Sequence, residues 1–278
     1  MIESQDIFEE IVRLRQAGED AVLATVVNTD ASSPGRVSFK MLVYPDGHIL
    51  GTVGGGLLEA NVIVEAKHAL VDRRPRLLHL KLTETNADGI GVLCGGEAEV
   101  YLEPVGAPPF LYLFGGGHIG LAIAAKVTDL DFRLVVLDDR EEFANRQRFP
   151  EADQVLAGPY GQLLGSVAAP GIQFQSSDSV VIVTRGHLAD EVVLAEVLKR
   201  DPQPGYVGMI GSRSKVAIVL QHLRDSGIPQ DRLDRVHSPI GLSIGGERPS
   251  EIAISILAEL IAHRHGKLTP KPPSLPPA

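Results

Sequence analysis

A glycine-rich stretch in the second half of the chain has the residue types and spacing of a phosphate-binding loop. Gly115, Gly117, His118 and Gly120 belong to a G-x-G-x-x-G pattern that follows an apolar run and precedes a helical pattern. In such loops the first glycine permits a tight turn, the second lets the backbone approach a pyrophosphate, and the third lets the helix pack on the sheet. Since a helix start presents free N–H groups, we expect a dinucleotide such as NAD(P) here.

An acidic residue lies at the distance from this loop that ribose recognition requires. Asp138 ends the next apolar run, 23 residues after Gly115. Its carboxylate is predicted to accept hydrogen bonds from ribose hydroxyls, which favours a 2′-hydroxyl over a 2′-phosphate. Arg140 weakens that preference because it adds a positive charge two residues later. The alternative is a loop that is retained for packing and binds another phosphate ligand or none.

Further candidate residues follow two later apolar runs of the same half. His187 follows the run that ends near Thr184, and Arg213 and Lys215 follow the run that ends at Ile210. In open α/β sheets, ligands bind outside the carboxyl ends of the strands. His187 could contact a ligand or titrate near neutral pH, or it could simply face water at a helix start. Arg213 and Lys215 would offer an anion two positive donors.

The first half has its own glycine cluster and the single cysteine of the chain. Gly54, Gly55 and Gly56 precede a helical pattern with Glu59 in its first turn. Three glycines cost backbone entropy, which suits a close approach to a phosphate or a pterin edge. The alternative is a structural loop, since an acid is favourable at any helix start. Cys94 is either a small buried hydrophobe or a thiolate that serves as a soft metal ligand or sulfur relay.

Strand and helix patterns alternate through the second half, which predicts a Rossmann-like, doubly wound parallel sheet. The strands are expected at residues 110–114, 134–137, 154–156, 179–184 and 206–210, and the helices at 119–127, 141–147, 188–199, 212–226 and 249–264. On the last helix Glu251, Ser255 and Glu259 recur every four residues, so we expect them to form its solvent-facing side.

The first half mixes strands with two helices, which predicts a smaller α+β domain. Helices are expected at residues 4–16 and 57–71, and strands at 21–27, 40–44, 48–53, 76–82 and 98–103, with a hairpin turn at 45–47. Prolines and a glycine at 103–109 indicate a domain boundary. We therefore expect the α+β domain over residues 1–104, the Rossmann-like domain over 105–268, and an extended, disordered, proline-rich tail over 269–278.

Composition narrows the class of protein. The net charge is −9 over 278 residues and no dense Lys/Arg run occurs, which argues against nucleic acid as a partner. A single cysteine excludes an intramolecular disulfide and suits a reducing compartment. No apolar run approaches the roughly 20 residues that span a membrane. We expect a cytoplasmic protein, with a homodimer as the commonest oligomer.

Together these motifs resemble the XdhC/CoxI family of xanthine dehydrogenase accessory factors. The resemblance spans about residues 5–266. Its motifs are Ser-Ser-Pro at 32–34, Lys-Met at 40–41, Gly-Thr-Val-Gly-Gly-Gly at 51–56 with Glu59, Cys-Gly-Gly at 94–96, Glu-Pro at 103–104, the glycine loop at 115–120, Thr-Arg-Gly-His at 184–187, Ile-Gly-Ser-Arg at 210–213, Pro-Ile-Gly-Leu at 239–242 and Pro-Ser-Glu-Ile-Ala at 249–253.

The resemblance implies a factor that binds molybdenum cofactor, assists its sulfuration and inserts it into a molybdenum hydroxylase such as xanthine dehydrogenase. It maps cofactor binding onto the first glycine cluster, with Glu59 and Cys94 as the residues that act on the cofactor and Cys94 as the metal ligand. A sulfur donor protein would be a second partner. Some members have a cysteine directly after the cluster, where this chain has Leu57, so sulfur handling rests on Cys94 alone.

Two other classes of function remain open from the residues. One is an NAD(P)-dependent oxidoreductase, which needs a positioned general acid or base and has His187 as its obvious candidate. The other is a dinucleotide-responsive regulator, which would bind NAD(H) and a protein but no pterin.

Overall fold

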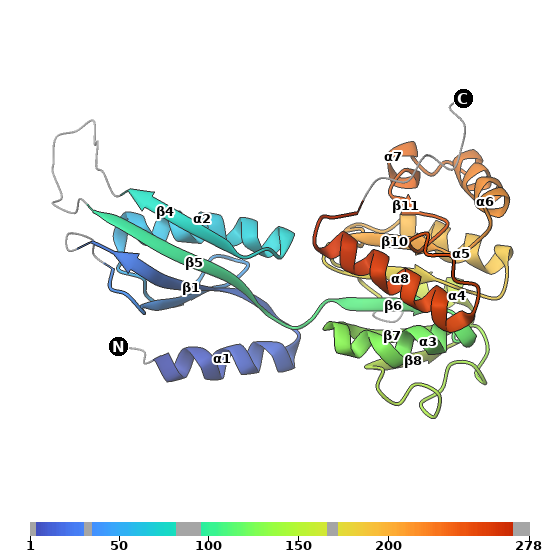
Figure 1. The fold of residues 1–278 in the computed structure, drawn as a ribbon, viewed down its shortest axis with the longest axis horizontal. Helices are drawn as coiled ribbons and strands as arrows, with labels where there is room; N and C mark the ends of the chain where they lie inside the picture. The colour runs from blue at the N-terminus through green and yellow to red at the C-terminus, as the bar shows by residue number, and fades with distance from the viewer. Residues whose placement is uncertain (1–3, 31–34, 82–95, 166–171, 269–278) are drawn as a thin grey trace. The chain divides into compact units, whose positions relative to one another are not determined.

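The computed structural model describes residues 4–30, 35–81, 96–165 and 172–268 (Figure 1). The chain divides into two compact units, residues 1–108 and 109–278. Cys94, the Ser-Ser-Pro motif and the proline-rich tail lie outside the described residues. The first unit is α+β and the second is a doubly wound parallel α/β unit, so the predicted fold class is confirmed.

The first unit is an antiparallel sheet of five strands in the order β3-β2-β1-β5-β4. Its elements are α1 (Ser4–Ala17), β1 (Asp20–Thr29), β2 (Lys40–Val43), β3 (Ile49–Gly51), α2 (Gly56–Asp72), β4 (Arg76–Lys81) and β5 (Glu97–Gly106). Alternate residues of β1 enter two different cores. Val22, Ala24 and Val26 pack with apolar residues of α2, whereas Ala21 and Leu23 pack with apolar residues of α1. The two helices therefore cover opposite faces of the sheet.

Strand β5 extends further than the proline-rich sequence predicts. It pairs with β1 as far as Gly106, and Pro104 lies opposite Val22. Strand β4 begins at Arg76, opposite Leu102, so the last residues of β5 pair with β1 alone in the described sheet. Proline is tolerated there because a strand with one neighbour has a side that needs no N–H donor. The two units divide after residue 108, four residues beyond the predicted boundary.

The second unit is a parallel sheet of six strands in the order β11-β10-β9-β6-β7-β8. Its elements are β6 (Phe110–Phe114), α3 (His118–Val127), β7 (Arg133–Asp138), β8 (Gln154–Ala157), α4 (Tyr160–Gly165), β9 (Ser179–Ile182), α5 (His187–Leu198), β10 (Tyr206–Met209), α6 (Arg213–Asp225), α7 (Gln230–Leu233), β11 (Val236–His237) and α8 (Pro249–Arg264).

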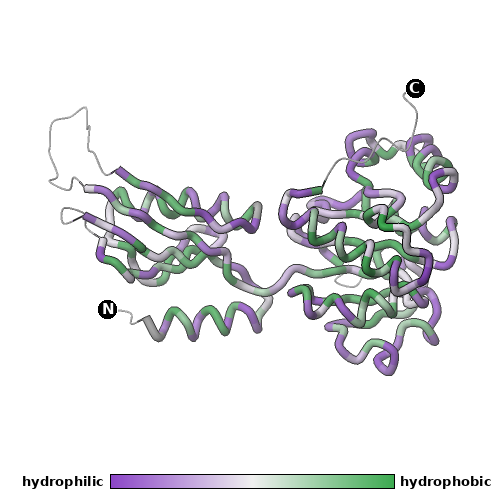
Figure 2. Tube along the Cα trace, in the orientation of Figure 1, coloured by the Kyte–Doolittle hydropathy of each residue, from purple (hydrophilic) through white to green (hydrophobic). Residues whose placement is uncertain are grey.

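The central strand β6 supplies apolar side chains to both faces of this sheet. Leu111 and Leu113 belong to the core that includes residues of α3 and α8, whereas Tyr112 and Phe114 belong to the core that includes residues of α5 and α6. Hydrophobic residues follow the strands of both units in Figure 2. The near-continuous apolar strands of the sequence are thus explained by helices on both faces.

The helix expected at residues 141–147 does not form, and this prediction is wrong. The chain makes a series of turns there instead. The Asn145 side-chain amide donates to the carbonyl oxygens of Glu141 and Glu142, at 3.2 Å each, and its Oδ1 accepts from the Arg148 N–H at 3.1 Å. These side-chain bonds compete with the backbone ladder of a helix.

The predicted solvent-facing side of the last helix is also wrong. Glu259 is fully buried, Ser255 is nearly so, and Glu251 is half-buried. The Tyr206 hydroxyl donates to Glu259 Oε1 at 2.7 Å, and the Ser255 hydroxyl donates to the Leu242 carbonyl at 2.5 Å. The four-residue repeat is therefore a polar seam that bonds α8 to β10 and to the preceding loop.

We predict that Tyr206→Phe lowers the free energy of unfolding of the second unit by roughly 1–3 kcal/mol, because the buried Glu259 carboxylate loses a hydroxyl donor. Urea denaturation followed by circular dichroism measures this change. Tyr112→Phe is the matched control, since Tyr112 is also buried in this sheet and its hydroxyl makes no hydrogen bond within the described part of the chain. Equal destabilisation by the two substitutions would contradict the prediction.

Candidate functional site

The carboxyl edge of the parallel sheet gathers the candidate residues of the second unit. Strands β10, β9, β6 and β7 are consecutive neighbours. Helices α3, α5 and α6 begin at His118, His187 and Arg213, directly after three of these strands, and Asp138 ends the fourth. The strand order reverses between β6 and β9, which is where open α/β sheets bind ligands. The structure thus brings candidates from four separate chain segments to one edge.

The first and the last glycine of the G-x-G-x-x-G pattern are required by packing. A Cβ added at Gly115 would lie 2.4 Å from the Val183 carbonyl oxygen, and one at Gly120 would lie 2.0 Å from the Gly115 carbonyl oxygen. Gly115 also has a φ of +115°, a conformation that L side chains rarely adopt. A Cβ at Gly117, by contrast, would meet nothing within 4 Å. Gly117 is therefore the point of this loop that a ligand can approach.

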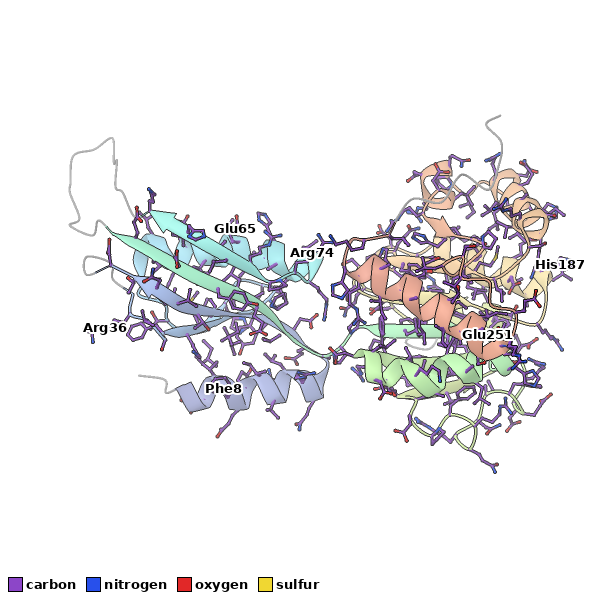
Figure 3. The ribbon with its side chains drawn as sticks, in the orientation of Figure 1. Phe8, Arg36, Glu65, Arg74, His187 and Glu251 are labelled. Carbon is purple, nitrogen blue, oxygen red and sulfur yellow. The ribbon has the colours of Figure 1, made fainter. Side chains whose placement is uncertain are left out.

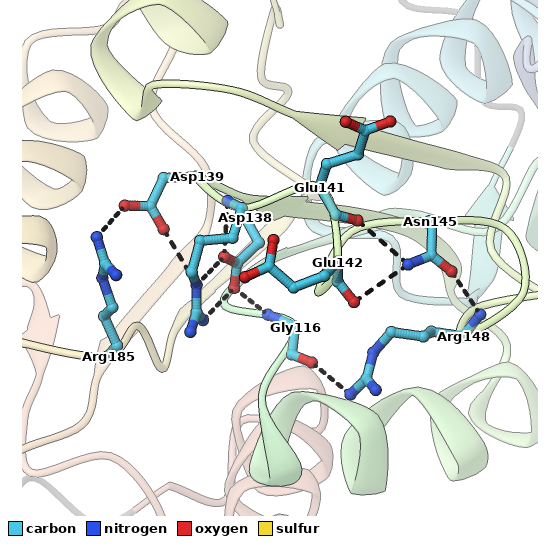
Figure 4. Close-up of polar contacts among 9 residues, drawn as sticks. Gly116, Asp138, Asp139, Glu141, Glu142, Asn145, Arg148 and Arg185 are labelled. Carbon is cyan, nitrogen blue, oxygen red and sulfur yellow. Dashed lines mark hydrogen bonds and ion pairs between the residues drawn. The ribbon is translucent and has the colours of Figure 1, made fainter.

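The Asp138 carboxylate, predicted to receive ribose hydroxyls, is bonded within its own chain (Figure 4). Oδ2 accepts from the Gly116 N–H at 2.8 Å and from Arg140 Nη2 at 3.1 Å. Oδ1 accepts from the Arg140 N–H at 3.1 Å and from its Nε at 2.9 Å. Burial opposes ionisation of this carboxyl, but the bonds from Arg140 and Gly116 hold its pKa below the usual value. The side chain is an ionised and fully buried connector.

The turns after β7 place Phe143 and Arg148 beside the glycine loop, which the helix predicted for this segment did not suggest. The Arg140 guanidinium stacks on the Phe143 ring, 3.7 Å from its centroid. Arg148 lies 5.2 Å from the same centroid and donates through Nη2 to the Gly116 carbonyl oxygen at 3.1 Å. The only sequence signal for this arrangement is Asn145, a residue that favours turns over helix interiors.

Lys215 is committed to an internal ion pair. Its Nζ lies 2.5 Å from Asp190 Oδ2, and the Thr184 hydroxyl donates to Asp190 Oδ1 at 2.5 Å. Asp190 is fully buried, so the cluster joins the starts of α5 and α6 to Thr184, two residues after the end of β9. Arg213 and His187 are exposed, and His187 points away from the core of its unit (Figure 3). Of the two predicted cationic donors, Arg213 is the one that faces solvent.

The first glycine cluster forms an open loop that is held from one side. Gly54, Gly55 and Gly56 all have positive φ, and a Cβ at Gly55 or Gly56 would meet nothing within 4 Å. Glu59 Oε1 accepts hydrogen bonds from the Gly55 N–H at 3.0 Å, from the Val53 N–H at 3.2 Å and from the Thr52 hydroxyl. Helix α2 begins at Gly56 without a side-chain cap. The Glu59 carboxylate thus holds the shape of the loop on one side, and the loop stays accessible on the side where a Cβ of Gly55 or Gly56 would point.

The metal-binding role predicted for Cys94 falls on a residue outside the described ranges. Among residues 4–30, 35–81, 96–165 and 172–268, no group of three His, Cys, Asp or Glu side chains is arranged to hold a metal ion. None of the helices in the same ranges has the length and apolarity needed to cross a membrane.

Two family models match the chain. The XdhC Rossmann domain matches residues 111–260, and the XdhC and CoxI family matches residues 14–81. An uncharacterized protein of Escherichia coli K12, YqeB, is 36% identical over 92% of this chain and 46% of its own length. A protein of Bacillus subtilis that is described as a probable subunit of xanthine dehydrogenase is 28% identical over 59% of this chain and 46% of its own length. The chain thus spans about half the length of these two relatives.

A third relative matches over most of both chains. It is the molybdenum cofactor insertion chaperone PaoD of Escherichia coli K12, 22% identical over 91% of this chain and 86% of its own length. Among solved structures, a xanthine dehydrogenase from Bacillus halodurans has a TM-score of 0.50 and 22% identity, and the likeness covers 95% of this chain and 97% of that one. The structural likeness concerns the fold alone.

The different surroundings of the two glycines predict opposite outcomes for the same substitution. Gly120→Ala is expected to destabilise the second unit by about 1–3 kcal/mol or more, because the added Cβ meets a backbone oxygen, although alanine normally favours a helix. Gly117→Ala is expected to cost about 0.5 kcal/mol, the loss of a favourable N-cap residue. Thermal unfolding of both variants measures the difference, and a similar loss in both would contradict the packing argument.

Proposed function

The chain belongs to the XdhC and CoxI family, and we propose that it is an accessory factor which binds molybdenum cofactor and assists its insertion into a molybdenum hydroxylase such as xanthine dehydrogenase. Two relatives support this role by their names, one as a probable part of a xanthine dehydrogenase and the other as a cofactor insertion chaperone. In this role the cofactor is cargo that the protein receives and hands on.

The open glycine loop of the first unit is the proposed cargo site, and it is the observation that carries the proposal. A Cβ at Gly55 or Gly56 would meet nothing within 4 Å, so a ligand group can approach the backbone there. Helix α2 begins at this point without a side-chain cap, so its positive end favours the phosphate of a pterin cofactor. The backbone donors at this helix start fit an anionic group better than an apolar one.

We assign Glu59 to holding the loop in shape. Its carboxylate bonds two backbone N–H groups and the Thr52 hydroxyl, which fixes glycines that would otherwise sample many conformations. Glu59 is thereby a positioning residue for the cargo. Sulfuration is the finer part of the proposal: sulfur from a donor protein would reach the bound cofactor by way of the Cys94 thiol.

An oxidoreductase has less support from the geometry. A dehydrogenase needs a general acid or base that is oriented by a partner. The His187 ring makes no hydrogen bond to a carboxylate within the described residues, and the Lys215 amine is paired with Asp190.

Protein purified from cells that make molybdenum cofactor is expected to retain molybdenum and pterin in equal amounts. Glu59→Ala is expected to lower the retained pterin about tenfold, since a charge-assisted hydrogen-bond acceptor to the loop is lost. Elemental analysis and pterin fluorescence measure both quantities. Glu65→Ala is the matched control because Glu65, labelled in Figure 3, lies on the same helix. Its carboxylate pairs with Arg76 at 3.1 Å instead of bonding the loop.

The outcomes separate the function from the role of the residue. Wild-type protein that carries neither molybdenum nor pterin would contradict the proposed function. Pterin that is unchanged or increased in Glu59→Ala, or equally reduced in Glu65→Ala, would contradict the role of Glu59 alone. Cys94→Ala is expected to lower the molybdenum content if its thiol ligates the metal, and unchanged metal content would remove that assignment.

A further inference from the structure

The carboxylate at the end of β7 has the position at which a Rossmann domain holds the ribose of a dinucleotide. In this chain it accepts four hydrogen bonds, one from Gly116 and three from Arg140. An ionised carboxylate has about four lone-pair sites. Gly116 and Arg140 therefore already occupy the lone pairs of Asp138 that the 2′- and 3′-hydroxyls of a ribose would need as acceptors.

Arg140 is fixed in this place from several sides. Its Nε and Nη2 contact both oxygens of Asp138, a bidentate geometry that is among the stronger hydrogen-bonded pairs in proteins. Its guanidinium stacks on Phe143, and its Nε lies 3.5 Å from Asp139 Oδ1. Asp139 Oδ2 in turn accepts from Arg185 Nη2 at 3.0 Å. A ribose would have to compete with all of these contacts.

The segment after β7 covers the same part of the glycine loop from a second direction. A Cβ on Gly116 would lie 2.1 Å from the Phe143 carbonyl oxygen, and Arg148 bonds the Gly116 carbonyl (Figure 4). Gly117, one residue further, has open space around it. The part of the loop that adjoins Asp138 is thus closed by the chain, whereas the part that begins α3 is open.

We propose that Arg140 stands in for the ribose hydroxyls at Asp138 and is the residue that makes this Rossmann unit discriminate against nucleotides with a ribose diol. Removal of the guanidinium then uncovers the carboxylate and opens the ribose half of a dinucleotide site. The proposal concerns the second unit and does not depend on the handling of molybdenum cofactor by the first.

The test uses the full chain and two ligand comparisons. NADH is titrated by fluorescence, and ADP and 2′,3′-dideoxy-ADP are titrated by calorimetry, into wild type, Arg140→Ala and Arg185→Ala. Arg185→Ala is the matched control, since it removes an arginine that bonds Asp139 at the same edge and does not contact Asp138. We expect Arg140→Ala to bind NADH about tenfold or more tighter than wild type and the control.

The preference for ADP over its dideoxy analogue isolates the role of the diol. Arg140→Ala is expected to acquire this preference, whereas wild type is expected to bind the two alike or to bind neither. Arg140→Lys keeps a positive charge beside the buried carboxylate, so it is expected to fold even if Arg140→Ala does not. Because lysine lacks the bidentate fork, we expect a gain in NADH affinity that is smaller than in Arg140→Ala.

Two results would overturn the proposal. One is a wild-type protein that already binds ADP at least tenfold tighter than 2′,3′-dideoxy-ADP. The other is that neither Arg140→Ala nor Arg140→Lys binds NADH more tightly than wild type does. Circular-dichroism melting curves establish that both variants are folded.

Discussion

The structure depends on carboxylates that bind the backbone N–H groups of glycine loops. Glu59 accepts from Gly55 and Val53 in the first unit, and Asp138 accepts from Gly116 in the second. Glycine loops leave donors that water or a partner must satisfy, and they have no side chains of their own to hold their shape. In each unit a carboxylate of the chain therefore holds one side of the loop, and only the other side, at Gly55 and Gly56 in the first unit and at Gly117 in the second, has room for an external group.

Buried acids extend the same principle through the second unit. Asp138, Asp190 and Glu259 are fully buried, and each is bonded to a residue from a different element. Burial of an unpaired charge would be very costly in free energy. Each carboxylate therefore fixes the positions of the residues that donate hydrogen bonds to it. Asp190 joins α5 to α6 and to the segment that follows β9, and Glu259 joins α8 to β10. The helices around the sheet are thus positioned by polar bonds as well as by the two apolar cores.

The sequence predicts the order of elements well because that order rests on local periodicity. The alternation of β6 to β10 with α3, α5 and α6 and the hairpin between β2 and β3 are read from apolar patterns and turn residues. The errors come from side-chain bonds, which apolar periodicity does not encode whether their partners are near or far in the sequence. Asn145 replaces a helix with turns, and the buried state of Glu259 depends on Tyr206, which is 53 residues away. Likewise, spacing identifies Asp138 but cannot reveal that Arg140 already occupies it.

The crowding around Gly115 and Gly120 bears on how such motifs are interpreted in any protein. Both positions exclude a methyl group because of neighbouring carbonyl oxygens of the same chain. A lineage in which this unit lost every nucleotide would still be obliged to keep them, since the architecture alone imposes the requirement. The presence of Gly115 and Gly120 is therefore explained by the fold alone. Only a glycine kept at position 117, where the fold does not require one, would indicate that a ligand binds.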